Sequence, residues 1–173
     1  HTKSSFYIFV ANDITIRKEN EQLHLMLEKT NAETITRLGL ATEYKNDSSP
    51  KHMRRVSRYC EVIALNMGMP KDKAKELRAA AKLHDLGKIG IPEQILSKPA
   101  ALTQQEWAVM KTAPTIGAKI LQDAESATLK VAHDIALTLH EHWDGRGYHC
   151  LLNTSDAADE RSSVQLGGRR NHK

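Results

Sequence analysis

The stretch that decides the fold is AKLHDLGKIGIPEQIL, residues 81–96, at the end of an Ala-rich segment. It places His84 beside Asp85, and Gly87 and Lys88 follow directly. Apolar residues lie three, seven and ten positions before His84, so a helix should turn this imidazole toward the core. Gly87 permits a sharp exit from the helix. Lys88 brings a cation to the same rim, where it can bind a phosphate oxygen or simply favour the helix dipole.

A second helix is predicted in SSPKHMRRVSRYCEVIALNMGMP, residues 48–70. Ser49 can cap it, Pro50 suits its first turn, and a glycine and a proline close it. His52 shares a stripe with apolar side chains that we expect to face the core: Val56, Tyr59 and Ile63. One inward histidine is usually a hydrogen-bonded core residue. Two helices that each deliver one, with a carboxylate adjacent, favour a metal site.

Composition favours one all-α globular domain, because 40% of the 173 residues are hydrophobic but only 5% are aromatic. Cys60 and Cys150 are too few for a disulfide framework, which predicts a reducing, cytoplasmic location. No apolar run reaches the roughly 18 residues of a membrane span. The net charge of +4 comes from interspersed acids and bases and therefore does not predict a nucleic-acid polymer as partner.

Two further helices are expected downstream. Thr103 followed by Glu106 is a capping-box pattern that opens a helix. A last apolar-rich helix should run from about Thr128 to His142 and carry His140.

The amino-terminal stretch SSFYIFVANDITIRKENEQL, residues 4–23, begins with a β-rich run and then becomes polar. We expect a short strand at Phe6–Val10 that hands over to a helix. The sequence D-I-T-x-R-K resembles the exit from the last strand of a PAS sensor domain, so residues 1–18 are interpreted as its end. Residues 19–44 would then form a connector helix, through which a homodimer is expected.

The order of motifs along the chain indicates a family. The chain reads HDLGKIGIPEQILSKPAALTQQEWAVMKTAPTIGAKIL from His84 and HEHWDGRGYH from His140. The motifs H-D-x-G-K-I-G-I-P, I-L-x-K-P, L-T-x-x-E, M-K-T-x-P-x-I-G and H-E-x-W-D-G-x-G-Y occur in the order of the HD-GYP family. From about Glu33 to Tyr148 the chain resembles this branch of the HD metal-dependent phosphohydrolases, whose members hydrolyse cyclic di-GMP.

The resemblance implies an HD-type helical bundle over residues 33–149 that encloses two, in some members three, iron or manganese ions. It implies a role in bacterial second-messenger signalling, with cyclic di-GMP as substrate and GGDEF-type or other signalling proteins as partners. Matched by motif, the metal ligands are His52, His84, Asp85 and His140. The same matching assigns catalytic roles to Lys88 and Asp85. The signature loop contains Gly145, Gly147 and Tyr148.

Three positions depart from the family pattern. Ala113 and Leu139 stand where the family has histidine ligands, and His149 replaces the signature proline. After Cys150 the resemblance ends, and residues 150–173 have no apolar stripe, so we interpret them as an unrelated, disordered or non-native tail. His172 and Asp159 in this tail are not counted as ligands.

These departures leave two readings open besides an active phosphodiesterase. One is a degenerate, non-catalytic HD-GYP module that binds nucleotide or a partner protein. The other is an HD phosphohydrolase for a different nucleotide, which the G-Y loop argues against. His133 and Asp134 form a second His-Asp pair without the Gly-Lys continuation, and we interpret them as structural. His142 and Trp143 are expected to shape the loop.

Overall fold

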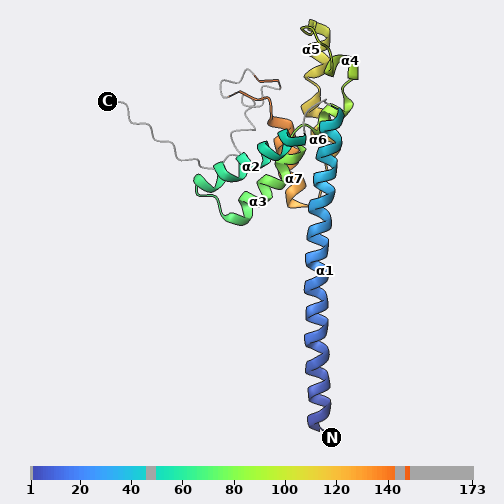
Figure 1. The fold of residues 1–173 in the computed structure, drawn as a ribbon, viewed down its shortest axis with the longest axis vertical. Coiled ribbons are helices and arrows are strands. Elements are labelled where there is room, and N and C mark those ends of the chain that lie inside the picture. Colours follow the sequence, from blue (N-terminus) through green and yellow to red (C-terminus); the bar gives the residue numbers. More distant parts are fainter. Residues whose placement is uncertain (1, 46–49, 143–146, 149–173) are drawn as a thin grey trace, which may run out of the picture. The chain divides into compact units, whose positions relative to one another are not determined.

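The computed structural model describes residues 2–45, 50–142 and 147–148. Every regular element in these ranges is a helix, which confirms the all-α class (Figure 1). In chain order the elements are α1 (Thr2–Lys45), α2 (Pro50–Asn66), α3 (Lys71–Ala80), η1 (Ala81–Leu83), η2 (Leu86–Gly90), α4 (Glu93–Leu96), α5 (Gln104–Met110), α6 (Ala113–Leu121) and α7 (Ala127–Thr138). The chain divides into two compact units, residues 1–83 and 84–173.

The predicted strand at Phe6–Val10 is wrong, because these residues belong to α1, one continuous helix of 44 residues (Figure 1). A strand needs a neighbouring strand to pair its backbone, and the described residues contain no strand. A helix satisfies its backbone groups internally. The helix expected over residues 19–44 is present within α1. No helix in the described part of the chain is both long and apolar enough to cross a membrane.

The core of the first unit uses a different face of α2 from the one predicted. Met53, Ser57 and Ala64 are buried, whereas Tyr59 and Ile63 are 62% and 58% exposed. Apolar side chains occupy two neighbouring stripes of this helix, so periodicity alone could not choose between them. Pro50 begins α2 as expected, and the predicted Ser49 cap lies outside the described residues.

In the first unit, small residues allow close packing, and a hydrogen bond joins α1 to η1. A Cβ at Gly39 of α1 would lie 2.6 Å from the carbonyl oxygen of Lys82, so this helix packs directly on the η1 backbone. Lys82 Nζ donates a hydrogen bond to Thr36 Oγ1 at 2.9 Å. Ala74 is fully buried and Ala81 nearly so, as the predicted inward stripe of the α3 segment requires. These contacts fix the backbone of η1, which ends at Leu83, directly before His84.

The second unit packs η2 against α6 and α6 against α7. Gly87 in η2 lies against the backbone of α6, because an added Cβ would meet the Ala113 carbonyl oxygen and Gly117 N. A Cβ on Gly117 would lie 3.1 Å from that of Ala136 in α7. Small residues at these crossings bring three backbone segments close together.

The predicted capping box is confirmed at the start of α5. The Glu106 backbone N–H donates to Thr103 Oγ1 at 3.3 Å, and the Thr103 N–H donates to Glu106 Oε2 at 2.7 Å. Lys98 Nζ also donates to both carboxylate oxygens, at 2.8 and 2.6 Å. The I-L-x-K-P connection is thereby tied to the following helix.

Gly87→Ala should lower the free energy of unfolding by about 1 to 3 kcal/mol, because its methyl group would collide with fixed helix backbone. Gly90→Ala, in the same η2 segment, is the matched control. Its Cβ would meet only the Ile116 side chain, with Cδ1 at 2.8 Å, which can move aside. Urea denaturation followed by circular dichroism measures both. Equal losses for the two variants would contradict the packing described for Gly87.

The Glu106 cap should be pH-dependent. The hydrogen bond from Lys98, and then that from the Thr103 backbone, lower the pKa of Glu106 from 4.5 to about 2. Its stabilising contribution is therefore complete above about pH 4.5 and is lost as the pH falls toward 2. The difference in Tm between wild type and Glu106→Gln should shrink across this range. A constant difference from pH 7 to pH 2 would show that the charge of Glu106 contributes nothing.

Candidate metal centre

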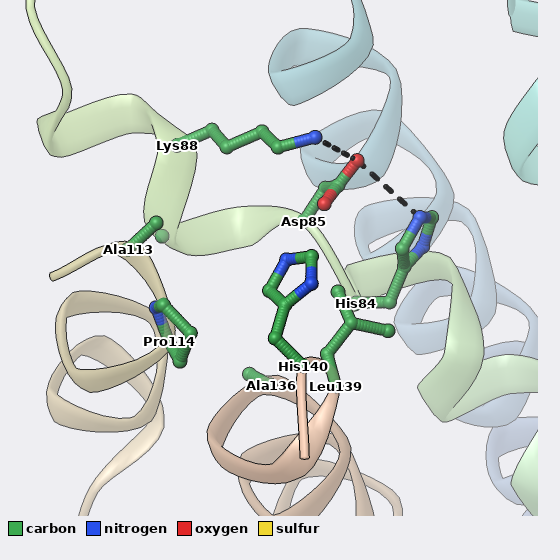
Figure 2. Close-up of a pocket in the computed structure, with 9 residues that line it drawn as sticks. His84, Asp85, Lys88, Ala113, Pro114, Ala136, Leu139 and His140 are labelled. Carbon is green, nitrogen blue, oxygen red and sulfur yellow. Dashed lines mark hydrogen bonds and ion pairs between the residues drawn. The ribbon is translucent and has the colours of Figure 1, made fainter. Parts of the chain in front are cut away.

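A narrow pocket in the second unit gathers four of the predicted site residues, His84, Asp85, Lys88 and His140 (Figure 2). Its volume is about 10 Å³, room for roughly one water molecule. The chain reaches it from the link between η1 and η2, the start of α6 and the end of α7. We call it the Asp85 pocket, and its lining residues are His84, Asp85, Gly87, Lys88, Ala113, Pro114, Ala136, Leu139 and His140.

The carboxylate of Asp85 is held between two cationic or potentially cationic partners. Lys88 Nζ lies 2.8 Å from Asp85 Oδ2, and His84 Nε2 lies 3.4 Å from the same oxygen (Figure 2). The side chains of His84 and Asp85 are only 7% and 11% exposed. Lys88 comes from η2, one 3₁₀ turn after the carboxylate, so the G-K spacing of the motif aims its ammonium back at Asp85.

The electrostatics prepare these groups to bind a cation. Burial raises the pKa of Asp85, but the hydrogen bond and charge of His84, followed by those of Lys88, outweigh this and hold the pKa well below its usual range. Asp85 is therefore ionised at neutral pH. Burial is also the main cause that lowers the pKa of His140, and the positive charge of Lys88 adds to it. A neutral imidazole offers a free lone pair for a metal.

The structure places His140 just beyond α7, which ends at Thr138. The predicted helix to His142 is therefore too long. The imidazole of His140 points into the Asp85 pocket in Figure 2. The ring of Tyr148 stacks on it, with centroids 4.5 Å apart and planes 23° apart, and the Tyr148 N–H donates to the His140 carbonyl at 3.3 Å.

The other predicted residues are distributed as follows. His52 is half-buried on α2 in the first unit. Gly147 lies against Glu141, whereas Gly145 falls outside the described residues, as do His149 and the tail at 150–173.

His133 and Cys60 lie apart from the pocket lining. His133 Nδ1 lies 2.9 Å from Asp134 Oδ1. Burial raises the pKa of the Cys60 thiol, which keeps it protonated and a poor metal ligand.

Ala113 and Leu139, where the resemblance led us to expect histidine ligands, both line the pocket. Ala113 is buried in its wall, and Leu139 lies beside His140 with 38% of its surface exposed (Figure 2). Neither a methyl nor an isobutyl group can coordinate a cation. Two imidazoles and one carboxylate remain in this unit, a donor set that suits iron or manganese. The residues present therefore fit one ion better than two.

Sequence reasoning missed Glu43 in the first unit. This carboxylate is only 1% exposed, and within the described part of the chain its Oε2 has no hydrogen-bond partner. An isolated buried carboxylate is costly, and a bound cation would offset that cost. Glu43 lies one turn after Gly39, on the packed face of α1, so an acidic residue at a core position was the available signal.

The family profile described as HD domain matches residues 40–156. The chain belongs to the HD domain family. The matched region includes His84 and Asp85, the His-Asp pair that lines the Asp85 pocket. The names of the relatives described next support the HD-GYP branch of this family.

Curated relatives agree with this membership. A protein of Thermotoga maritima named cyclic di-GMP phosphodiesterase is 41% identical over 77% of this HD domain chain and 36% of its own length. The Vibrio cholerae 3'3'-cGAMP-specific phosphodiesterase 2 is 38% identical over 86% of this chain and 28% of its own. The response regulator RpfG of Xanthomonas campestris, named a cyclic di-GMP phosphodiesterase, is 37% identical over 70% and 32%. The chain spans about a third of the length of these relatives.

Leu139→His should increase metal binding, because it returns an imidazole to the pocket wall beside His140. We expect the apparent Kd for Mn²⁺ to fall by about tenfold or more. Metal content after anaerobic loading and dialysis, measured by mass spectrometry, tests this. Lys130→His adds an exposed imidazole on α7 outside the Asp85 pocket and is the control. Unchanged content in Leu139→His would mean that this position does not limit metal binding.

Proposed function

We propose that this HD domain is a metal-dependent phosphodiesterase that hydrolyses cyclic di-GMP in bacterial second-messenger signalling. The observation that carries the proposal is the buried, ionised Asp85, held between His84 and Lys88 in a pocket that His140 also lines. The names of the Thermotoga maritima and Xanthomonas campestris relatives support this substrate. Other relatives are named for 3'3'-cGAMP, so a cyclic dinucleotide is the substrate class.

We propose His52, His84, Asp85 and His140 as metal ligands, with Asp85 as the bridge if a second ion binds. Glu43, the buried carboxylate of the first unit, is a further ligand candidate, because its oxygen is a donor suited to iron or manganese. A bound divalent ion would supply a water of lowered pKa and neutralise phosphodiester oxygens.

The side chains of this chain have separate tasks in the proposed reaction. Lys88 provides an ammonium, 26% exposed at the rim of the pocket, that can hold a phosphate oxygen. Ionised Asp85 positions that ammonium and supplies the negative charge that would hold a metal ion in the pocket. The stack of Tyr148 on His140 keeps the imidazole in place. We propose Gly145, Gly147 and Tyr148 as the substrate or signature-loop residues.

A degenerate module that binds nucleotide or a partner without hydrolysis is the second candidate. Ala113 and Leu139 favour it, because they remove two imidazoles from the pocket wall. Lys88 and Tyr148 would still recognise a phosphate and an aromatic base in such a module.

The neighbouring domains, partners and location of this HD domain are proposed from the sequence alone. Residues 1–18 would be the end of a PAS-like sensor domain, although α1 is helical there. Residues 19–44 would transmit its state and hold a homodimer together. GGDEF-type or other signalling proteins are proposed partners, in a reducing cytoplasm.

Hydrolysis of cyclic di-GMP by the anaerobically prepared chain with added iron or manganese tests the function. Asp85→Asn keeps the shape of the side chain but removes its charge, and should lower turnover by at least about a hundredfold. Lys130→Gln, a neutralised exposed lysine on α7, should retain full activity.

No turnover by folded wild-type chain, with nucleotide binding retained in equilibrium dialysis, would refute the phosphodiesterase and establish the binding module. Equal turnover by wild type and Asp85→Asn would remove Asp85 from the mechanism.

A further inference from the structure

The first unit brings together three positively charged side chains, Arg54 from α2, Arg78 from α3 and Lys82 from η1. These three elements and α1 all pack on one another in this unit (Figure 1). None of the three residues lines the Asp85 pocket. We call them the Lys82 cluster.

The ammonium of Lys82 lies at the junction with α1. The side chain is half-buried, and Nζ donates a hydrogen bond to Thr36 Oγ1 at 2.9 Å. The Thr36 hydroxyl in turn donates to the carbonyl of Ala32 at 2.7 Å. Within the described part of the chain the ammonium has no carboxylate partner. Because an ammonium carries three N–H donors, two of them remain available for a ligand.

The two arginines lie on the sides of α2 and α3 that face each other. Arg78 precedes Lys82 by one helical turn, and its Nη1 donates to Glu61 Oε2 of α2 at 2.7 Å. Arg54 lies on the same side of α2, two turns before Glu61. Residues 67–70 join the two helices as a hairpin, so α2 and α3 run antiparallel. Residues before Glu61 are therefore level with residues after Arg78, which places Arg54 toward Lys82.

The charges of the cluster are not balanced. Burial lowers the pKa of Lys82, and the positive charges of Arg78 and then Arg54 lower it further. Of the three cations, only Arg78 forms an ion pair within the described residues. Three positive charges and the one carboxylate of Glu61 leave a formal charge of 3 − 1 = +2. An anion bound among these groups would relieve their mutual repulsion.

We propose that the Lys82 cluster is a binding site for a phosphomonoester dianion. Guanidinium and ammonium groups are the side chains that bind phosphate in proteins. A phosphomonoester carries a charge of about −1.5 to −2 at neutral pH, which matches the cluster, whereas a phosphodiester carries only about −1. Inorganic phosphate and the terminal phosphate of a mononucleotide both supply this group. The bound anion would join α2 to α3 and, through Lys82 and Thr36, to α1.

Equilibrium dialysis of radiolabelled inorganic phosphate with the metal-free chain, at an ionic strength held constant with KCl, tests the site. We expect one phosphate per chain. Arg54→Gln and Lys82→Gln should each raise its Kd about three- to tenfold, as expected for loss of one partly exposed charged contact. Arg55→Gln is the matched control, because it removes the same charge from a different face of α2 and should leave the Kd unchanged. Circular dichroism checks that each variant is folded.

Competition tests the class of ligand. Unlabelled GMP, which has a terminal phosphate, should displace the bound phosphate. Cyclic di-GMP, which contains only diesters, should displace much less at the same concentration. Equal displacement by the two nucleotides would overturn the assignment to a dianion.

Three outcomes of the dialysis would overturn the site itself. Folded wild type would bind no phosphate, or Arg55→Gln would weaken binding as much as Arg54→Gln, which would reduce the effect to net charge. In the third outcome, Lys88→Gln abolishes binding and the variants of the Lys82 cluster do not, which would place the anion in the Asp85 pocket. Neither metal nor hydrolysis enters the measurement, so its result is independent of the proposed function.

Discussion

The buried carboxylate of Asp85 is the constraint on which the site depends. With only 11% of its side chain exposed, it would be costly without positive partners, and His84 and Lys88 supply them at 3.4 and 2.8 Å. The same partners keep it ionised, since they lower its pKa against the opposing effect of burial. One arrangement therefore stabilises the fold locally and retains a charge that can bind a cation or orient an ammonium toward phosphate.

That arrangement needs backbone segments to approach more closely than most side chains allow. Gly87 lies against the start of α6, and Gly117 lies against Gly87 and Ala136. The result is a pocket wall made of small residues, into which His140 projects from the turn after α7. The same close packing explains why the Asp85 pocket is so small.

Much of the site could be predicted because its signals are local. The inward turn of His84 follows from helical periodicity, and the Thr103–Glu106 capping box from two residue types at a fixed spacing. Predictions that depended on distant partners failed. The run at Phe6–Val10 has β propensity but is helical, because no described strand pairs with it. Tyr59 and Ile63 are exposed because α2 packs through its neighbouring stripe.

The sequence by itself determined the helical class and the family, because motif order and helical spacing are properties of the chain. It also indicated that Ala113 and Leu139 cannot be ligands, since that follows from side-chain chemistry alone. Only the tertiary structure decided that both line the pocket, that Glu43 is buried, and that Tyr148 stacks on His140. These facts depend on contacts between residues far apart in the chain, which no local pattern encodes.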